Sequence, residues 1–196
     1  MNNSEKFYDR LTFLYPIIEL FLRLRKREFF RIINRYPTGR LLEIGVGNGT
    51  SLKYYARHEV IGIDTSKNML TKARKNSSKN IQLFHMNGEM LIFQNELFDY
   101  VVLSHVIAVV EDPEKLFQEI HRVLKPNGKV IILNHFTPDN WLQYVDRSFE
   151  WVSKWLHFKS VFRMSSLNSI KHFQLLRDIN GGLFSYFKIL IYEKMA

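Results

Sequence analysis

The chain has 196 residues, a hydrophobic content of 46%, no cysteine and a formal net charge of +9. This length is typical of one domain, and the hydrophobic content allows a core and excludes a disordered chain. The lack of cysteine excludes a disulfide framework, a cysteine-based zinc site, an iron–sulfur cluster and a cysteine nucleophile. The excess positive charge indicates nucleic acid, an anionic membrane or an acidic substrate as partner, and charge alone does not choose among them.

The N-terminal segment carries no recognisable targeting signal. Residues 1–10 are polar and charged, unlike a signal peptide, and Pro16, Glu19 and Arg23 interrupt the apolar run 11–24. That run is also shorter than the ~20 apolar residues that a membrane-spanning helix needs. We therefore expect a cytoplasmic protein that associates peripherally with a membrane.

Short apolar runs alternate with helical patterns along the first two thirds of the chain. A helix is predicted over 16–36, ahead of five short runs that are typical of strands buried on both faces of a parallel sheet. These predicted strands are 40–44, 60–64, 81–86, 100–104 and 129–134. The helices predicted between strands are 50–57, 66–75 with Ser66 as its cap, and one that begins at Asp112-Pro113-Glu114 and is stopped by 125–128. This alternation indicates a doubly wound α/β fold.

The pattern changes in the last third of the chain. Residues 140–157 are rich in aromatic side chains and are predicted to be helical. Two further strands, 173–179 and 184–192, flank the turn signal Asn180-Gly181-Gly182. An antiparallel hairpin is therefore expected at the edge of the sheet.

A glycine-rich turn between the first strand and the next helix is the sharpest chemical feature. Residues 43–49 read EIGVGNG, and such glycines let the backbone approach a ligand that the helix-start N–H groups face. The spacing G-x-G-x-G differs from the dinucleotide fingerprint, because position 50 is Thr. The second strand ends nineteen residues after Gly45 in Asp64, which can accept hydrogen bonds from both hydroxyls of a ribose. The alternatives are a plain tight turn and a helix-capping aspartate.

Further motifs extend this pattern in a fixed order. They are VIGID followed by TSKNML at 60–70, NGEM at 87–90, FDYVVLSHVI at 98–107 and HRVLKPNGKVIIL at 121–133. With the glycine turn, residues 39–135 resemble class I S-adenosylmethionine-dependent methyltransferases. The resemblance implies a Rossmann-like, doubly wound sheet of seven strands, mostly parallel with an antiparallel C-terminal strand, and helices on both faces. It implies one domain: an amphipathic helical segment (1–38), a cofactor-binding core (39–135), and a lid helix with a hairpin (136–196).

The same resemblance implies a binding site for S-adenosylmethionine, which leaves as S-adenosylhomocysteine. Glu43, Gly45 and Gly47 would surround the methionine part, and Asp64 would hold the ribose. The residues expected along the rest of the cofactor are Val46, Gly49, Thr65, Ser66, Met69, Asn87, Gly88, Glu89 and Ser104. Met69 would contact the adenine ring, while either Asn87 or Glu89 would bind its amine, because Asn87 replaces the usual aspartate. Ser104 and His105 would end the fourth strand beside the reactive methyl group.

A narrower resemblance concerns the substrate. Phe7-Tyr8-Asp9, GVGNGTSLKYY at 45–55, IAVVEDP at 107–113 and Asn134-His135-Phe136 are similar to bacterial phospholipid N-methyltransferases, which convert phosphatidylethanolamine towards phosphatidylcholine. An ethanolamine head group carries an ammonium near neutral pH, so a base or a desolvating site must remove its proton before it can accept a methyl group. His135 and His105 are the candidate bases, and Tyr8 and Tyr144 are candidates to orient the amine. Each histidine could instead be a structural hydrogen-bonding group.

Two segments have a composition suited to a lipid surface. Residues 17–35 combine apolar and basic side chains, as in helices that bind anionic membranes. Residues 141–159 combine Trp, Tyr and Phe with basic residues, which suits an interfacial depth. The alternatives are a core helix with a solvated face and a lid helix whose aromatic side chains line a pocket.

Other functions remain open at this point. The acceptor could be a soluble small molecule or a quinone precursor, and a non-catalytic cofactor- or lipid-binding module is a third possibility. Nucleic acid is not expected, because Ser104-His105-Val106-Ile107 stands where methyltransferases of base amino groups carry a [DN]-P-P-[aromatic] run. No metal is expected, since the histidines and acids show no ligand spacing, and the protein is expected to act as a monomer.

Overall fold

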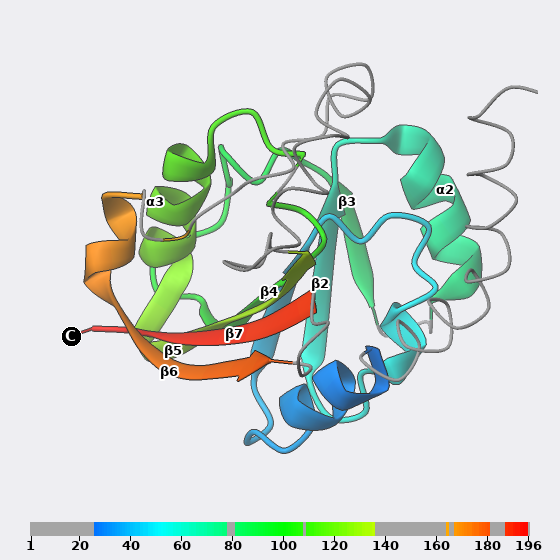
Figure 1. Ribbon diagram of the computed structural model, residues 1–196. Coiled ribbons are helices and arrows are strands. Elements are labelled where there is room, and N and C mark those ends of the chain that lie inside the picture. Colours follow the sequence, from blue (N-terminus) through cyan, green and yellow to red (C-terminus); the bar gives the residue numbers. More distant parts are fainter. Residues whose placement is uncertain are drawn as a thin grey trace, which may run out of the picture.

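The computed structural model describes residues 26–77, 81–107, 109–135, 164, 167–180 and 187–195, and the predictions for 1–25 and 140–157 lie outside this range. A seven-stranded sheet forms the centre of the molecule (Figure 1). The strands are β1 (Arg40–Ile44), β2 (Glu59–Asp64), β3 (Gln82–His85), β4 (Phe98–Ser104), β5 (Leu124–His135), β6 (Phe173–Asn180) and β7 (Phe187–Lys194). The helices are α2 (Lys67–Asn76), α3 (Pro113–Val123), the short 3-10 turns η1 (Leu52–Tyr54) and η3 (Ser169–His172), and the helical residues 26–33.

The strand order is β3-β2-β1-β4-β5-β7-β6. All pairs from β3 to β5 are parallel, and β7 lies antiparallel between β5 and β6. This confirms the predicted doubly wound sheet with its antiparallel C-terminal strand. The chain leaves β1 for β2 on one side, whereas β4 lies on its other side, so the strand order reverses between β1 and β4. In such sheets, ligands bind beyond the carboxyl ends of the strands at this reversal point.

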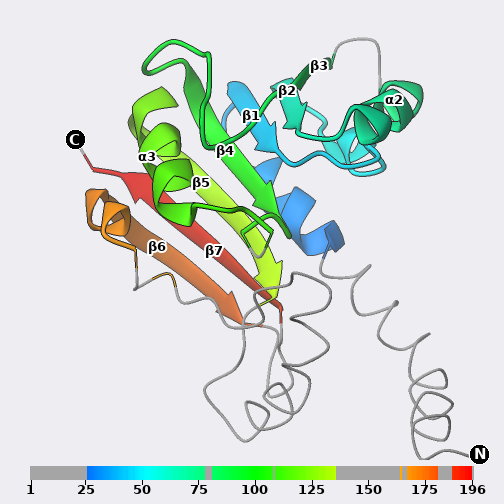
Figure 2. The same cartoon turned by 90° about the horizontal axis from the view of Figure 1, so that it is seen from above.

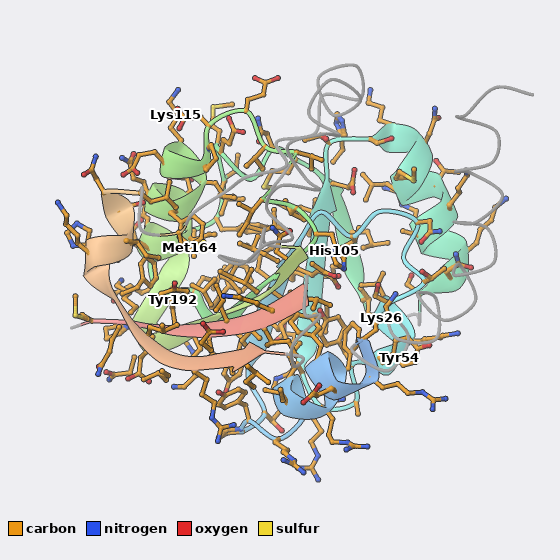
Figure 3. The ribbon with its side chains drawn as sticks, viewed as in Figure 1. Lys26, Tyr54, His105, Lys115, Met164 and Tyr192 are labelled. Carbon is orange, nitrogen blue, oxygen red and sulfur yellow. The ribbon has the colours of Figure 1, made fainter. Side chains whose placement is uncertain are left out.

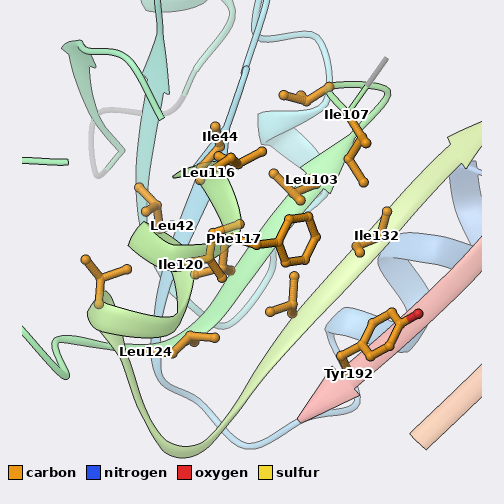
Figure 4. Close-up of a cluster of buried hydrophobic side chains, with 14 of the residues drawn as sticks. Leu42, Ile44, Leu103, Ile107, Leu116, Phe117, Ile120, Leu124, Ile132 and Tyr192 are labelled. Carbon is orange, nitrogen blue, oxygen red and sulfur yellow. The ribbon is translucent and has the colours of Figure 1, made fainter. Parts of the chain in front are cut away.

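Apolar side chains alternate between two cores, one on each face of the sheet. Leu42 and Ile44 of β1 pack with α3 residues in the first core, which Figure 4 shows around Phe117. Leu41 of β1 belongs to the second core, which contains the buried side chains of residues 26–33, η1 and α2. Figure 2 shows α3 and the helical residues 26–33 on opposite sides of the sheet. Helices therefore cover both faces, as predicted.

The predicted caps place the starts of both helices. The Asp112 carboxylate accepts a hydrogen bond from the backbone N–H of Lys115 (3.1 Å), and Pro113 occupies the first helical position. The Ser66 hydroxyl accepts one from the N–H of Met69 (3.3 Å) at the start of α2. In each case a side-chain oxygen satisfies an N–H group that the first turn leaves unpaired.

One predicted helix was wrong, and one predicted strand begins earlier than expected. Residues 50–57 form only the single turn η1, because Asn34 competes for their backbone: its amide donates to the Tyr54 carbonyl (2.8 Å) and accepts from the Ala56 N–H (3.1 Å). Residues 125–128 were expected to follow the helix as a stop signal before a strand. The helix does end there, at Val123, but β5 already pairs with β4 at Leu124, so 125–128 form an irregularity inside the strand.

Gly49 allows α2 to pack against the glycine turn, which leads to a first prediction. Its φ is +75°, and a Cβ there would lie 2.6 Å from the Ala73 Cα. Gly47 has a φ of +56°, but a Cβ there would meet nothing within 4 Å. We expect Gly49→Ala to cost about 2–4 kcal/mol of unfolding free energy, from backbone strain plus overpacking. Gly47→Ala is the matched control, with a cost of about 1–2 kcal/mol from strain alone. Equal losses in urea denaturation would contradict the proposed contact.

Candidate active site

The glycine turn is held by backbone hydrogen bonds to the neighbouring strand. The N–H groups of Gly45 and Val46 both donate to the Ile63 carbonyl, at 2.8 and 3.1 Å. Gly45 has a φ of +76°, and a Cβ there would clash with the Val106 side chain. Glycine is therefore required at position 45 both for the backbone angle and for the close approach of the segment after β4.

Asp64 organises the turn from the end of β2. One carboxylate oxygen accepts the N–H of Gly47 and the other accepts the N–H of Ser66, both at 2.8 Å. A carboxylate has about four acceptor sites, so two remain for a ligand. The half-buried Asp64 side chain also lines a cavity, which means that it both shapes the loop and faces the ligand space.

A cavity of about 370 Å³ opens where the strand order reverses. It is lined by the ends of β1, β2 and β4 and by the segments that follow β3 and β4. Eight of the residues predicted for the site line it: Gly45, Asp64, Thr65, Asn87, Gly88, Glu89, Ser104 and His105. The structure thus brings together side chains from four motifs that are far apart in the sequence.

Other predicted site residues lie off this cavity or outside the described range. Six predicted cofactor residues do not line it: Glu43, Val46, Gly47, Gly49, Ser66 and Met69. They belong to β1, the glycine turn and the start of α2, next to lining residues. Tyr8 and Tyr144 lie outside the described residues, and of His135 only the backbone is described, paired with Phe187 of β7.

Asn87 and Glu89 differ in the partners that already occupy them. The Glu89 carboxylate accepts the backbone N–H groups of Glu111 and Asp112, at 2.9 and 3.1 Å. The Asn87 side-chain oxygen accepts only the nearby N–H of Glu89 (2.9 Å), and its side chain is exposed. Glu89 therefore fastens the segment before α3 to the rim of the cavity, and its acceptor capacity is partly used. Both side chains keep free acceptor sites, so either one can contact a ligand.

His105 has a constrained backbone at the end of β4. Its φ is +59°, a left-handed value that is uncommon for residues other than glycine. Its N–H donates to the Leu133 carbonyl of β5 (2.8 Å), which holds the ends of the two strands together. Strained backbone of this kind is concentrated at functional sites, because the surrounding structure fixes the side chain for its task.

Glu43 is a buried acid on the second face of the sheet. Its side chain is 1% exposed, and its Oε2 has no hydrogen-bond partner among the described residues. Burial raises the pKa of Glu43 to about 7, and the nearby Tyr55 hydroxyl and Lys26 ammonium offset only part of this rise. A buried carboxylate oxygen without a hydrogen-bond partner is costly to ionise, so a further cationic group beside Glu43 would favour its charged form.

Sequence reasoning missed the mostly apolar segment of the lining that follows β4. Val106, Val109, Val110 and Glu111 follow β4 and line the cavity, and Val109 is 59% exposed. These residues could have been predicted as part of the site, since they connect the end of a sheet strand to the Asp112 cap. The Glu89 contacts that hold this segment in place join residues more than twenty positions apart, and local patterns do not reveal such contacts.

The residues present fit an adenosine-containing cofactor with a cationic amino acid part. Asp64 retains acceptor sites for ribose hydroxyls, Asn87 offers a polar edge, and the orphaned Glu43 oxygen is suited to an ammonium group. Within the described ranges, no group of three or more His, Asp or Glu side chains could hold a metal ion. No helix among the described residues is long and apolar enough to cross a membrane.

Comparison with known proteins places the chain in a family. A family model described as "Methyltransferase domain" matches residues 42–132. A phosphatidylethanolamine N-methyltransferase of Cereibacter sphaeroides is 33% identical in an alignment of 160 positions that covers 76% of this chain and 79% of that protein. A demethylmenaquinone methyltransferase of Bacillus cereus is 30% identical in an alignment of 145 positions that covers 68% of this chain and 61% of that protein.

A solved structure supports the fold. A putative methyltransferase from Bacillus halodurans C-125 superposes with a TM-score of 0.71 at 15% identity, over 87% of this chain and 99% of that one. The strand order, the glycine turn with Asp64, the matched domain and the similarity to these relatives all lead to one family. This chain belongs to the S-adenosylmethionine-dependent methyltransferases.

Proposed function

We propose that this protein transfers methyl groups from S-adenosylmethionine to the amine of phosphatidylethanolamine and its methylated forms, towards phosphatidylcholine, at the cytoplasmic surface of a membrane. The observation that carries the proposal is the similarity to the C. sphaeroides phosphatidylethanolamine N-methyltransferase, which extends over 76% of this chain. The similarity continues well beyond the matched domain at 42–132, so it includes sequence outside the cofactor core.

The cofactor supplies a methyl group on a positively charged sulfur, and the protein aligns the acceptor with it. In the proposed arrangement Asp64 holds the ribose and either Asn87 or Glu89 the adenine edge. Glu43 and the glycine turn hold the methionine part. Ser104 and His105, at the end of β4, border the space that the acceptor amine would enter.

The acceptor must lose a proton before it can attack, because the amine of an ethanolamine head group is an ammonium near neutral pH. His105 lines the cavity, and His135 ends the adjacent strand β5. We assign one of these histidines as the base, with Tyr8 and Tyr144 orienting the amine. The exposed Val109 and half-buried Val110 provide apolar lining that would lower the local polarity and favour the neutral amine.

The test is an incubation of the purified protein with isotopically labelled S-adenosylmethionine and a total lipid extract, followed by chromatography. Label in mono-, di- or trimethylated ethanolamine lipids is the expected result, and label only in a water-soluble product would overturn the proposal. The same assay on His135→Ala and His105→Ala tests the proposed base. We expect one of the two variants to lose at least about 100-fold in kcat, which general base catalysis can account for.

A quinone precursor is the second candidate acceptor. It is favoured by the similarity to the demethylmenaquinone methyltransferase of B. cereus, which covers 68% of this chain. A parallel incubation with demethylmenaquinone separates the two acceptors, since transfer to the quinone without transfer to lipid would select this candidate.

A further inference from the structure

The charge of the molecule is divided between the two faces of the sheet. Three segments cover one face of the sheet: residues 26–36, 50–58 and 67–76. They contain the helical residues 26–33, η1 and α2, and all their buried side chains belong to the second core. These segments carry ten basic side chains and one acidic side chain, Glu28. We call this surface the basic face; its basic residues are Lys26, Arg27, Arg31, Arg35, Lys53, Arg57, Lys67, Lys72, Arg74 and Lys75.

The opposite face has the reverse balance. Residues 86–97 and 109–123, which pack in the first core, carry six acidic side chains and two basic ones. Figure 3 shows Lys26 and Tyr54 on the side of α2 and Lys115 on the side of α3. The positive excess of the described residues is therefore concentrated on one face.

The basic face also differs from the rest of the protein in how its charges are paired. None of its ten basic side chains forms a salt bridge with a described carboxylate, and all except the half-buried Lys26 are exposed. Seven of the nine other described Lys and Arg residues do form one, such as Lys129 with Glu193 (2.6 Å). The basic face could therefore bind an anionic surface without breaking a salt bridge between these described residues.

Specific contacts hold the three segments in place around the second core. Phe30 packs against Tyr54 with ring centroids 5.2 Å apart, and Asn34 hydrogen-bonds to the backbone of Tyr54 and Ala56. The Asn76 amide of α2 donates to the Asn48 carbonyl (2.9 Å) in the glycine turn. The charges are thus held in a set arrangement rather than on independent segments.

The basic face adjoins the edge of the sheet that carries the cavity. Helix α2 begins three residues after Asp64, which lines the cavity, so Lys67 lies near that edge. The ammonium groups of Lys26 and Lys53 lie 6.0 and 5.4 Å from the Tyr54 ring centroid, in the segment that follows β1. Contact through this end of the face would bring the cavity close to the anionic surface.

We propose that the basic face, including α2 and η1, docks the enzyme on an anionic lipid bilayer and brings the cavity to the membrane. An anionic bilayer attracts clustered Lys and Arg over an extended surface without requiring matched pockets. Single-stranded nucleic acid fits less well, because it uses free aromatic rings for stacking. Here Lys26, Lys53 and Phe30 already surround the one exposed ring of this face, Tyr54. This inference rests on the proposed function, which places the enzyme at a membrane, and it names the surface that docks there; it is tested by binding alone.

The test compares two triple variants of the full chain in sedimentation with vesicles. Lys53→Gln, Lys72→Gln and Lys75→Gln remove three charges from the basic face, and Lys115→Gln, Lys171→Gln and Arg177→Gln remove three exposed charges elsewhere. The vesicles contain phosphatidylcholine with about one third phosphatidylglycerol, and pure phosphatidylcholine is the reference. Each basic residue near such a surface contributes about fivefold to binding, so the first variant is expected to lose at least about tenfold. The second variant is expected to stay within about twofold of the parent.

Binding of an RNA oligomer is measured in parallel with vesicle binding. Three results would overturn the docking proposal. The first variant could bind vesicles as well as the parent does, both variants could lose equal vesicle affinity, or the first variant could lose affinity for RNA alone. Circular dichroism melting of both variants checks that each is folded. Methyl transfer to a short-chain phosphatidylethanolamine dissolved as monomers is expected to be unchanged in the first variant. If no variant or parent methylates any lipid, the proposed substrate fails while the vesicle result still decides the docking surface.

Discussion

Replacing Asp64 with alanine is expected to raise the Kd for S-adenosylmethionine by about 100-fold or more. The carboxylate is proposed to accept both ribose hydroxyls, and hydrogen bonds to a charged group contribute about 1.5–3 kcal/mol each. Its loss also leaves the N–H groups of Gly47 and Ser66 without the acceptor that fixes the glycine turn. Isothermal titration calorimetry with the cofactor measures this change directly.

Two matched variants locate the effect. Asp64→Asn keeps one oxygen acceptor, so it can hold only one of the two N–H groups and should weaken binding by less than alanine does. Asp99→Asn disturbs a comparable carboxylate near the start of β4, at the end of the strands opposite the cavity. There Asp99 accepts the Arg40 N–H (2.8 Å) and pairs with Lys125 (2.7 Å). It should reduce stability and leave cofactor affinity unchanged. Parental affinity in Asp64→Ala would remove Asp64 from the site.

The fold was predictable because its signals are local. The runs that became β1, β2 and β4 are apolar on both faces, and Ser66 and Asp112 cap helices within three residues of themselves. The single turn η1 was missed because Asn34, twenty residues earlier, takes the hydrogen bonds that a helix would need. A pattern of helix-forming residues does not show competition from a distant side chain.

The sequence motifs predicted which residues gather at the site, but they predicted less well what each residue does there. The topology alone brings the ends of β1, β2 and β4 together, so Gly45, Asp64 and Ser104 share one cavity. The role of Glu89 as a fastener of the segment before α3 depends on a contact with Glu111 and Asp112 that no spacing rule describes. The predicted roles of His135, Tyr8 and Tyr144, and the division of the chain into three segments, stay predictions.

The buried acid Glu43 is expected to make the protein less stable as the pH rises from about 4.5 to 7. Its pKa is about 7 in the folded protein, against an ordinary value of 4.5, because burial disfavours the charged form. In this interval the folded state holds a proton that the unfolded state has lost, so the unfolding free energy falls by about 1.4 kcal/mol per pH unit. The total penalty is about 3 kcal/mol, and it is complete above pH 7.

Glu43→Gln removes this titration and therefore isolates it. The difference in unfolding free energy between the variant and the parent should grow by about 3 kcal/mol, in favour of the variant, from pH 4.5 to pH 7.5. Other titrating groups are common to both proteins and cancel in that difference, which urea denaturation at a series of pH values measures. A constant difference would show that Glu43 ionises normally in the folded state. Saturating cofactor should reduce this increase of the free-energy difference with pH if its ammonium group neutralises the Glu43 carboxylate, because binding would then lower the pKa of Glu43. If cofactor leaves this increase unchanged, Glu43 is a buried structural acid that the cofactor does not contact.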